Sequence, residues 1–337
     1  MNLTVASSDE LIRNPRVQRP HVVILGAGAS RAACPSGDRN GHRLPVMADF
    51  ISVLDLDPLL ARYGIDYAGK NFEILYSSLC SDESRLGLLR EIESAVYEYF
   101  ASLKLPDSPT IYDYLLLSLR RKDVVFTFNW DPLLYDAWVR NRHFHLPEIF
   151  FLHGNARVAY CASHGHWGTP GLRCPECSAE LTPSRLLYPV AQKNYSSDPH
   201  ISGVWESARW FLKNAFLLTI FGYGAPDSDI DAVNIMETAW RERGDRLVER
   251  VEIIDIESRE VLYEKWKPFF FYHHYDVRRT FSESWIARYP RRSCEALYAP
   301  GIEGRPADQF PMPPNIGFGE LYEWLLPVTG YESTPMA

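Results

Sequence analysis

The stretch that decides the fold is His21-Val-Val-Ile-Leu-Gly26-Ala-Gly28-Ala-Ser30. A continuous apolar run that ends at a glycine is typical of a central parallel strand buried on both faces. Gly26 and Gly28 let the backbone turn tightly behind that strand and approach a pyrophosphate, whose charge would be met by free N–H groups and a helix dipole. The third glycine of the dinucleotide fingerprint is absent, because Arg31 stands in its place. A tight strand-to-helix turn without a ligand therefore stays an alternative.

Further apolar runs alternate with helical patterns along the chain. Strands are expected at 123–128, 149–152, 216–221, 251–256 and 269–275. Helices are expected at 46–54, 85–103, 110–121, 133–140, 201–214, 227–243, 259–266 and 318–326. This alternation predicts an α/β fold with a Rossmann-like, doubly wound parallel sheet.

The composition divides the chain into three regions. We expect an N-terminal extension at 1–20, a catalytic domain at 21–280, and a C-terminal arm and helix at 281–337. The catalytic domain would contain a small helical module at about 44–121 and a zinc-ribbon-like insert at about 158–182, where Cys, His, Gly and Pro accumulate. The segment 289–314 is rich in Pro, Gly and Arg, which predicts an extended arm ordered by a neighbouring subunit, with a surface loop on a monomer as the alternative.

Charge and hydropathy exclude some classes of protein. The net charge of −8 over 337 residues argues against a nucleic-acid binder that works through overall charge. The apolar runs are too short to span a bilayer, and the polar N-terminus lacks the apolar core of a signal peptide. We therefore expect a cytoplasmic protein with no membrane contact. In a reducing compartment, a cluster among the six cysteines favours a metal site over disulfides.

Polar residues follow the second and third expected strands. Asn129 and Asp131 lie in Thr127-Phe-Asn-Trp-Asp131, and His153 closes the third strand. The carboxyl ends of strands in a doubly wound sheet face the ligand crevice, so these side chains are candidates for contact with a ring or a sugar. His153 could accept a proton near neutral pH. Helix capping by Asn129 or Asp131, and a purely structural histidine, are the alternatives.

Two Cys-containing pairs in the insert have metal-ligand spacing. Cys161-Ala-Ser-His164 and Cys174-Pro-Glu-Cys177 each hold two intervening residues, as zinc knuckles do. His166 competes with His164 for the fourth position. Four protein ligands leave no open coordination site, so this Zn²⁺ would be structural. Three free cysteines in a loop are the alternative.

In their order along residues 22–256, these motifs resemble those of sirtuins, and of their divergent bacterial branch in particular. The resemblance implies an NAD-binding Rossmann domain in which Asn129 and Asp131 line the nicotinamide and ribose pocket and His153 is the catalytic base. The implied NAD-binding residues are Gly26, Ala27, Gly28, Ser30, Gly222, Tyr223 and Ser228. Asp255, at the end of the strand 251–256, is expected to face the adenosine, with a solvated carboxylate as the alternative.

The peptide-facing half of a deacylase is not recognisable in this sequence. The Ile-Pro-Asp-Phe-Arg segment of deacylases is replaced by Cys34-Pro-Ser-Gly-Asp38, and their Phe-Gly-Glu strand by the stretch 187–195. The pattern looks like the sirtuin-like NAD+ hydrolases of bacterial antiviral defence. We therefore expect a hydrolase that converts NAD+ to nicotinamide and ADP-ribose and acts in antiphage defence by NAD+ depletion. A protein-lysine deacylase and a non-catalytic nucleotide-binding subunit are the alternatives.

An enzyme that destroys NAD+ must be restrained until it is needed. We therefore expect a homo-oligomer or a larger complex, with an ATPase, an Argonaute-like protein or a sensor protein as partner and no direct contact to nucleic acid. His273 and His274 adjoin in the expected strand 269–275 and would point to opposite faces, so both are interpreted as structural.

Overall fold

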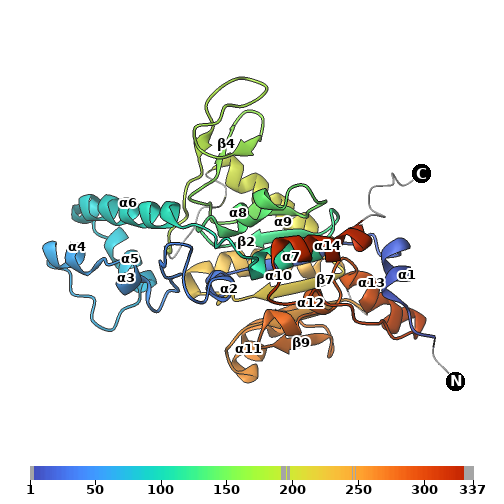
Figure 1. Cartoon of the computed structure of the whole chain (residues 1–337). Helices are drawn as coiled ribbons and strands as arrows, with labels where there is room; N and C mark the ends of the chain where they lie inside the picture. Colours follow the sequence, from blue (N-terminus) through green and yellow to red (C-terminus); the bar gives the residue numbers. More distant parts are fainter. Residues whose placement is uncertain (1–3, 191–194, 196–197, 245, 247, 330–337) are drawn as a thin grey trace.

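A parallel sheet of six strands forms the centre of the computed structural model, which describes residues 4–190, 195, 198–244, 246 and 248–329. The strands lie in the order β3-β2-β1-β7-β8-β9 (Figure 1). Their bounds are β1 His21–Leu25, β2 Val124–Thr127, β3 Glu148–Phe151, β7 Leu217–Phe221, β8 Arg250–Ile254 and β9 Tyr275–Arg278. When the six strands of this sheet are renumbered 1 to 6 in chain order, their spatial order is 3-2-1-4-5-6, that of the Rossmann fold. The predicted doubly wound sheet is confirmed.

The central strand β1 shows why its sequence is apolar from Val22 to Leu25, after the buried His21. All five of its residues are buried, and it pairs with β2 on one side and β7 on the other. Val23 and Leu25 belong to one hydrophobic core, whereas Val22 and Ile24 belong to a second core on the opposite face. From β1 the chain adds strands on one side of the sheet as far as β3 and then returns to add β7, β8 and β9 on the other side. The crevice at the carboxyl ends of β1 and β7 is therefore the switch point where such folds bind ligands.

Helices cover both faces of the sheet. The first core is covered by α2 Ala27–Ala33, α7 Ile111–Ser118, α8 Leu133–Arg140, α12 Trp285–Arg288 and α14 Phe318–Thr329. The second is covered by α9 Pro199–Asn214, α10 Ile230–Arg241 and α11 Arg259–Trp266. The helices expected at 133–140 and 259–266 are present with the predicted ends, and those expected at 110–121, 201–214, 227–243 and 318–326 are present with shifted ends.

Two smaller units project from this core. The helices α3 Phe50–Val53, α4 Asp57–Arg62, α5 Phe72–Cys80 and α6 Leu86–Ser102 extend to one side of the sheet in Figure 1. The expected helix 46–54 is therefore reduced to the single turn of α3. A three-stranded antiparallel sheet, β5-β4-β6, carries the cysteine-rich insert at the top of the same view. Its strands are β4 Ala159–Tyr160, β5 Trp167–Gly168 and β6 Thr182–Pro183.

The C-terminal segment corrects the expectation of an arm ordered by a neighbour. It folds as α13 Ser293–Tyr298 and a π-helical turn at Ala299–Glu303, and it packs against the N-terminal helix α1 Ser8–Arg13. Arg291 and Arg292 are each 1% exposed. The Arg291 guanidinium donates to the carbonyl of Leu117, 3.1 Å away. The start of the segment is therefore held by its own chain. It packs in a hydrophobic cluster with α1, and its arginines bind backbone carbonyls of the same chain.

The expected strand 269–275 is also wrong. Lys267–Phe269 is a 3₁₀ turn, and β9 starts only at Tyr275. Phe269 is fully buried beside Trp266, and Tyr272 adopts a φ of +55°, which turns the chain before the strand begins. Among the described residues no helix is long and apolar enough to cross a membrane.

Candidate active site at the switch point

A cavity of about 770 Å³ opens at the carboxyl ends of the parallel strands. It is bounded by the segments that follow β1, β2, β3, β7 and β8, and by the start of α5. Every residue that the sequence assigned to catalysis or to NAD binding lies along it: Gly26, Ala27, Gly28, Ser30, Asn129, Asp131, His153, Gly222, Tyr223, Ser228 and Asp255. The fold therefore brings residues from five separate turns into one site.

The glycines after β1 and β7 allow two backbone turns to touch. A Cβ atom on Gly222, which has a φ of +58°, would lie 2.3 Å from the nitrogen of Ala29. A Cβ atom on Gly26 would lie 2.5 Å from the carbonyl oxygen of Gly222. The N–H of Gly28 donates to that same carbonyl at 2.9 Å. The glycine motif thus holds the two turns together, and the Gly28 N–H is not a free donor for phosphate as the sequence suggested.

Asn129 is fixed by a buried hydrogen-bond network. Its Nδ2 donates to the carbonyl of Gly26 at 2.9 Å and to the hydroxyl of Ser30 at 2.8 Å. Because a carbonyl can only accept, these contacts define which end of the amide is nitrogen. The hydroxyl of Tyr112 lies 2.6 Å from Ser30 and 3.3 Å from the Asn129 nitrogen. Both Nδ2 hydrogens are committed to the protein, so the amide offers its oxygen to a ligand or a water.

Asp131 completes this network and also binds the backbone before α8. One carboxylate oxygen lies 2.6 Å from the Ser30 hydroxyl, and the other accepts the N–H of Leu133, the first residue of α8. Burial raises the pKa of Asp131 to about 6, against the lowering effect of the hydrogen bonds from Ser30 and Leu133. The N-cap of α8 is Pro132, so the carboxylate stabilises the turn into the helix and also belongs to the site.

His153 lines the same cavity directly after β3, the neighbour of β2 in the sheet. Its Nε2 lies 3.3 Å from the hydroxyl of Tyr195 and 3.8 Å from a carboxylate oxygen of Asp229. The other Asp229 oxygen accepts the hydroxyl of Tyr223 at 2.8 Å. The Tyr223 ring stacks on Phe128 at 4.0 Å, and Phe128 meets the imidazole edge-on at 4.7 Å. A buried carboxylate and two phenols thus position the imidazole.

Asp255, Ser228 and Lys265 line the part of the cavity next to β7 and β8. Asp255 is half-buried after β8 and accepts the N–H of Glu257 at 3.1 Å, so its carboxylate is partly engaged in a turn. The N–H of Ser228 donates to a carboxylate oxygen of Glu73, at 2.7 Å. Lys265 lines the same region and donates to the carbonyl of Gly224.

Three residues that contact the candidate catalytic residues or their network were missed at the level of sequence: Tyr112, Tyr195 and Asp229. Tyr112 lies within an ordinary helical pattern, 17 positions before the asparagine that it contacts. Asp229 is visible in the Gly222 turn, but nothing in the local pattern shows that it turns inward to His153. Only polar residues at strand ends carried a local signal.

The four metal-ligand candidates of the insert converge. The ligand atoms of Cys161, His164, Cys174 and Cys177 all lie within 4.8 Å of one another. The Nδ1 of His164 is 3.6 Å from the sulfurs of both Cys161 and Cys174, and the sulfurs of Cys161 and Cys177 are 3.7 Å apart. Bonds of about 2.3 Å to sulfur and 2.0 Å to nitrogen place tetrahedral ligand atoms roughly 3.5–3.8 Å apart. The cluster can therefore hold a structural zinc ion.

His166 is not part of this cluster. Its Nε2 lies 2.7 Å from Glu176, outside the ligand group. The competition between His164 and His166 is thereby resolved in favour of His164, and the alternative of three unassociated cysteines is wrong. Cys161 directly follows β4, and Cys174 lies in the loop between β5 and β6. Because β4 pairs with both β5 and β6, the small sheet brings the two knuckles together.

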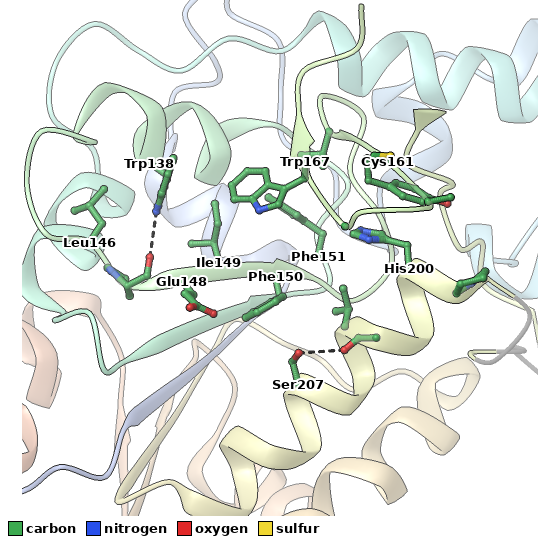
Figure 2. A pocket seen from close by; sticks show the side chains of 18 of the residues that line it. Trp138, Leu146, Glu148, Ile149, Phe150, Phe151, Cys161, Trp167, His200 and Ser207 are labelled. Atoms are coloured by element: carbon green, nitrogen blue, oxygen red, sulfur yellow. Dashed lines mark hydrogen bonds between the residues drawn. The ribbon is translucent and has the colours of Figure 1, made fainter. Parts of the chain in front are cut away.

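A second cavity, of about 820 Å³, lies at the free edge of β3, below the insert. Figure 2 shows Trp138 and Trp167 above the strand and His200 and Ser207 on α9 beside it. The Trp138 indole donates to the carbonyl of Pro147 at 3.1 Å. Cys161 is the one predicted site residue in its lining, and it belongs to the metal cluster. This cavity therefore lies apart from the catalytic candidates.

Solved structures similar to this chain are Sir2 homologues, the family that the motifs resemble. A Sir2 homologue in complex with NAD shares 15% identity at a TM-score of 0.41, over 86% of this chain and 89% of that one. A complex of Sir2 with a p53 peptide and NAD+ shares 14% at a TM-score of 0.37, over 88% and 96%. No protein-family model and no curated protein sequence matches. At this identity no residue role is carried over from those structures.

Proposed function

We propose that the chain cleaves the nicotinamide–ribose bond of NAD+ and that water is the nucleophile. The observation that carries the proposal is the presence of two positioned polar groups in one cavity, at the ends of the neighbouring strands β2 and β3. The Asn129 amide is oriented by Gly26 and Ser30, and His153 is positioned by Tyr195 and Asp229.

The chemistry requires these groups. When the C1′–N bond breaks, nicotinamide leaves with the bonding electron pair and the ribose becomes an oxocarbenium-like cation. The oxygen of Asn129 would accept a hydrogen bond from the attacking water or the ribose hydroxyls, and Asp131 would supply negative charge near the cation. A new C1′–O bond forms, and the proton of the water passes to His153. The products are nicotinamide, ADP-ribose and one proton.

Contacts around His153 support water over an acyl-lysine peptide. The segment that replaces the peptide-pairing strand of deacylases is tied to this chain itself. The Leu187 N–H donates to the His153 carbonyl at 2.9 Å, and Ser77 of α5 donates to the carbonyl of Pro189 at 2.8 Å. The ring of Tyr188 stacks on Tyr76 at 4.9 Å. The described part of this segment, residues 187–190, is thus held by contacts within the chain, and these contacts support the proposal that water is the nucleophile.

Incubation with NAD+, with and without an acyl-lysine peptide, tests the proposal. Release of nicotinamide and ADP-ribose that does not depend on the peptide is the expected result. Release that requires the peptide would identify a deacylase. Saturable NAD+ binding without turnover, in the presence of every candidate partner, would identify a nucleotide-binding subunit.

The biological setting is proposed from the motif resemblance. NAD+ depletion in antiphage defence fits a hydrolase of this pattern, in the cytoplasm and within a homo-oligomer or a complex with an ATPase, an Argonaute-like protein or a sensor. The genes adjacent to this one test the setting, because a defence enzyme is expected beside such a partner.

A further inference from the structure

We propose that Glu73 is an internal competitor for the pyrophosphate of NAD+ and restrains the enzyme until α5 moves. This inference rests on the proposed function. Glu73 lies in the first turn of α5, and its carboxylate accepts the backbone N–H of Ser228 at 2.7 Å. Ser228 follows β7 in the turn that faces Gly26 and Gly28 across the switch point. A carboxylate thus occupies a backbone N–H of the same cavity in which the fold would bind the phosphates.

The charge around this contact makes the competition effective. Six carboxylates line the cavity: Glu73, Asp131, Asp227, Asp229, Asp255 and Glu257. Among the described residues of the lining, Lys265 is the single lysine or arginine, and its ammonium group donates to the carbonyl of Gly224. The pyrophosphate of NAD+ carries two negative charges, so it meets repulsion unless a carboxylate withdraws.

Two backbone donors of the glycine turn are already engaged. The Gly28 N–H donates to the carbonyl of Gly222, and the Ala29 N–H donates to that of Gly26. The Ser228 N–H is a further backbone donor in the lining of the cavity, and Glu73 occupies it. Displacement of Glu73 would remove one negative charge and release one N–H at the same position.

The position of Glu73 makes the contact suited to control. It belongs to the helical module, which extends to one side of the sheet, whereas Ser228 belongs to the Rossmann core (Figure 1). Phe72, the next residue towards the N-terminus, is fully buried against Phe50 at 4.2 Å. The Glu73 carboxylate is consequently fixed to the body of the module, and a partner that shifts the module would shift the carboxylate with it.

Binding measurements on Glu73→Ala and Glu73→Gln test the inference. Titration calorimetry with NAD+ and, separately, with inorganic pyrophosphate should show affinity at least roughly tenfold higher for Glu73→Ala than for the wild type, the scale of one charged hydrogen bond. Glu73→Gln should gain less, because its amide oxygen can still accept the Ser228 N–H while the charge is lost. Glu257→Gln, which removes an exposed carboxylate from the same cavity, is the control and should change affinity by less than about threefold.

The outcomes separate this inference from the proposed function. If Glu73→Ala binds both ligands more tightly but no variant cleaves NAD+, the competitor is supported and the hydrolase is refuted. If the wild type and Glu73→Ala cleave NAD+ with the same KM, the hydrolase is supported and the competitor is refuted. Equal gains for Glu73→Ala and Glu257→Gln, or no pyrophosphate binding by Glu73→Ala, would also overturn the competitor.

Discussion

Replacing Asp131 by asparagine should stabilise the protein while it removes activity. The carboxyl group is buried, and its pKa is raised to about 6 from the ordinary 3.8, chiefly because burial disfavours its charged form. Asparagine is neutral at every pH. Its oxygen can accept the Leu133 N–H and its nitrogen can donate to the Ser30 hydroxyl, so the contacts of the wild-type side chain are preserved.

The size and pH dependence of the effect follow from linkage. The pKa of Asp131 is higher in the folded state than in the unfolded chain. The contribution of this group to the free energy of unfolding is therefore fully present below pH 3.8 and is lost as the pH rises through 6. A shift of about two units at 1.36 kcal/mol each costs the wild type about 3 kcal/mol at pH 7.5 and about 1 kcal/mol at pH 4.5. Asp131→Asn avoids this cost, so its melting temperature should exceed that of the wild type by roughly 5 °C at pH 7.5, and by clearly less at pH 4.5.

Thermal melts of the wild type, Asp131→Asn and Asp227→Asn at both pH values provide the measurement. Asp227 is an exposed carboxylate in the same cavity, and its variant should melt like the wild type at each pH. NAD+ cleavage by Asp131→Asn at pH 7.5 should fall at least tenfold, because the negative charge near the ribose cation is lost. A difference in melting temperature that does not depend on pH, or a less stable Asp131→Asn at pH 7.5, would refute the reasoning.

Three further predictions concern the site, the metal and the assembly. Asn129→Ala and His153→Ala should each abolish NAD+ cleavage and leave the circular dichroism spectrum unchanged; wild-type rates in both would remove them from the mechanism. Elemental analysis should find about one zinc per chain, lost in His164→Ala and retained in His166→Ala, and Cys174→Ser should lower the melting temperature because a structural metal contributes folding free energy; equal zinc in both histidine variants would contradict the ligand set. Light scattering should find an oligomer or, with its partner, a complex; a monomer at micromolar concentration with full NAD+ hydrolysis would contradict both the oligomer and the restraint.

The sheet was predictable because its strands are buried on both faces. A strand such as β1 has no solvent side, so its sequence is a continuous apolar run that ends at a glycine. Polar residues directly after such runs must lie at the carboxyl edge, which is why Asn129, Asp131 and His153 could be assigned to one site. Spacing likewise identified the zinc ligands, since two knuckles of fixed length carry their geometry locally.

Contacts between distant segments left no such signal. Arg291 and Arg292 suggested an exposed basic arm, yet they are buried and donate to backbone carbonyls. The run from Phe269 to Tyr272 has the apolar character of a strand, but the chain turns at Tyr272 before pairing begins. In each case local composition was outweighed by packing that depends on residues far away in the sequence.

One helix reaches both sides of the candidate active site. From α5, Glu73 contacts the turn at Ser228 on the phosphate side, while Ser77 binds the carbonyl of Pro189. Two residues before that carbonyl, the Leu187 N–H holds the backbone of His153 on the catalytic side. A displacement of α5 would therefore open the phosphate position and release the segment next to the catalytic base in one movement. A partner that acts on the helical module would control substrate binding and catalysis together, without touching the buried network around Asn129.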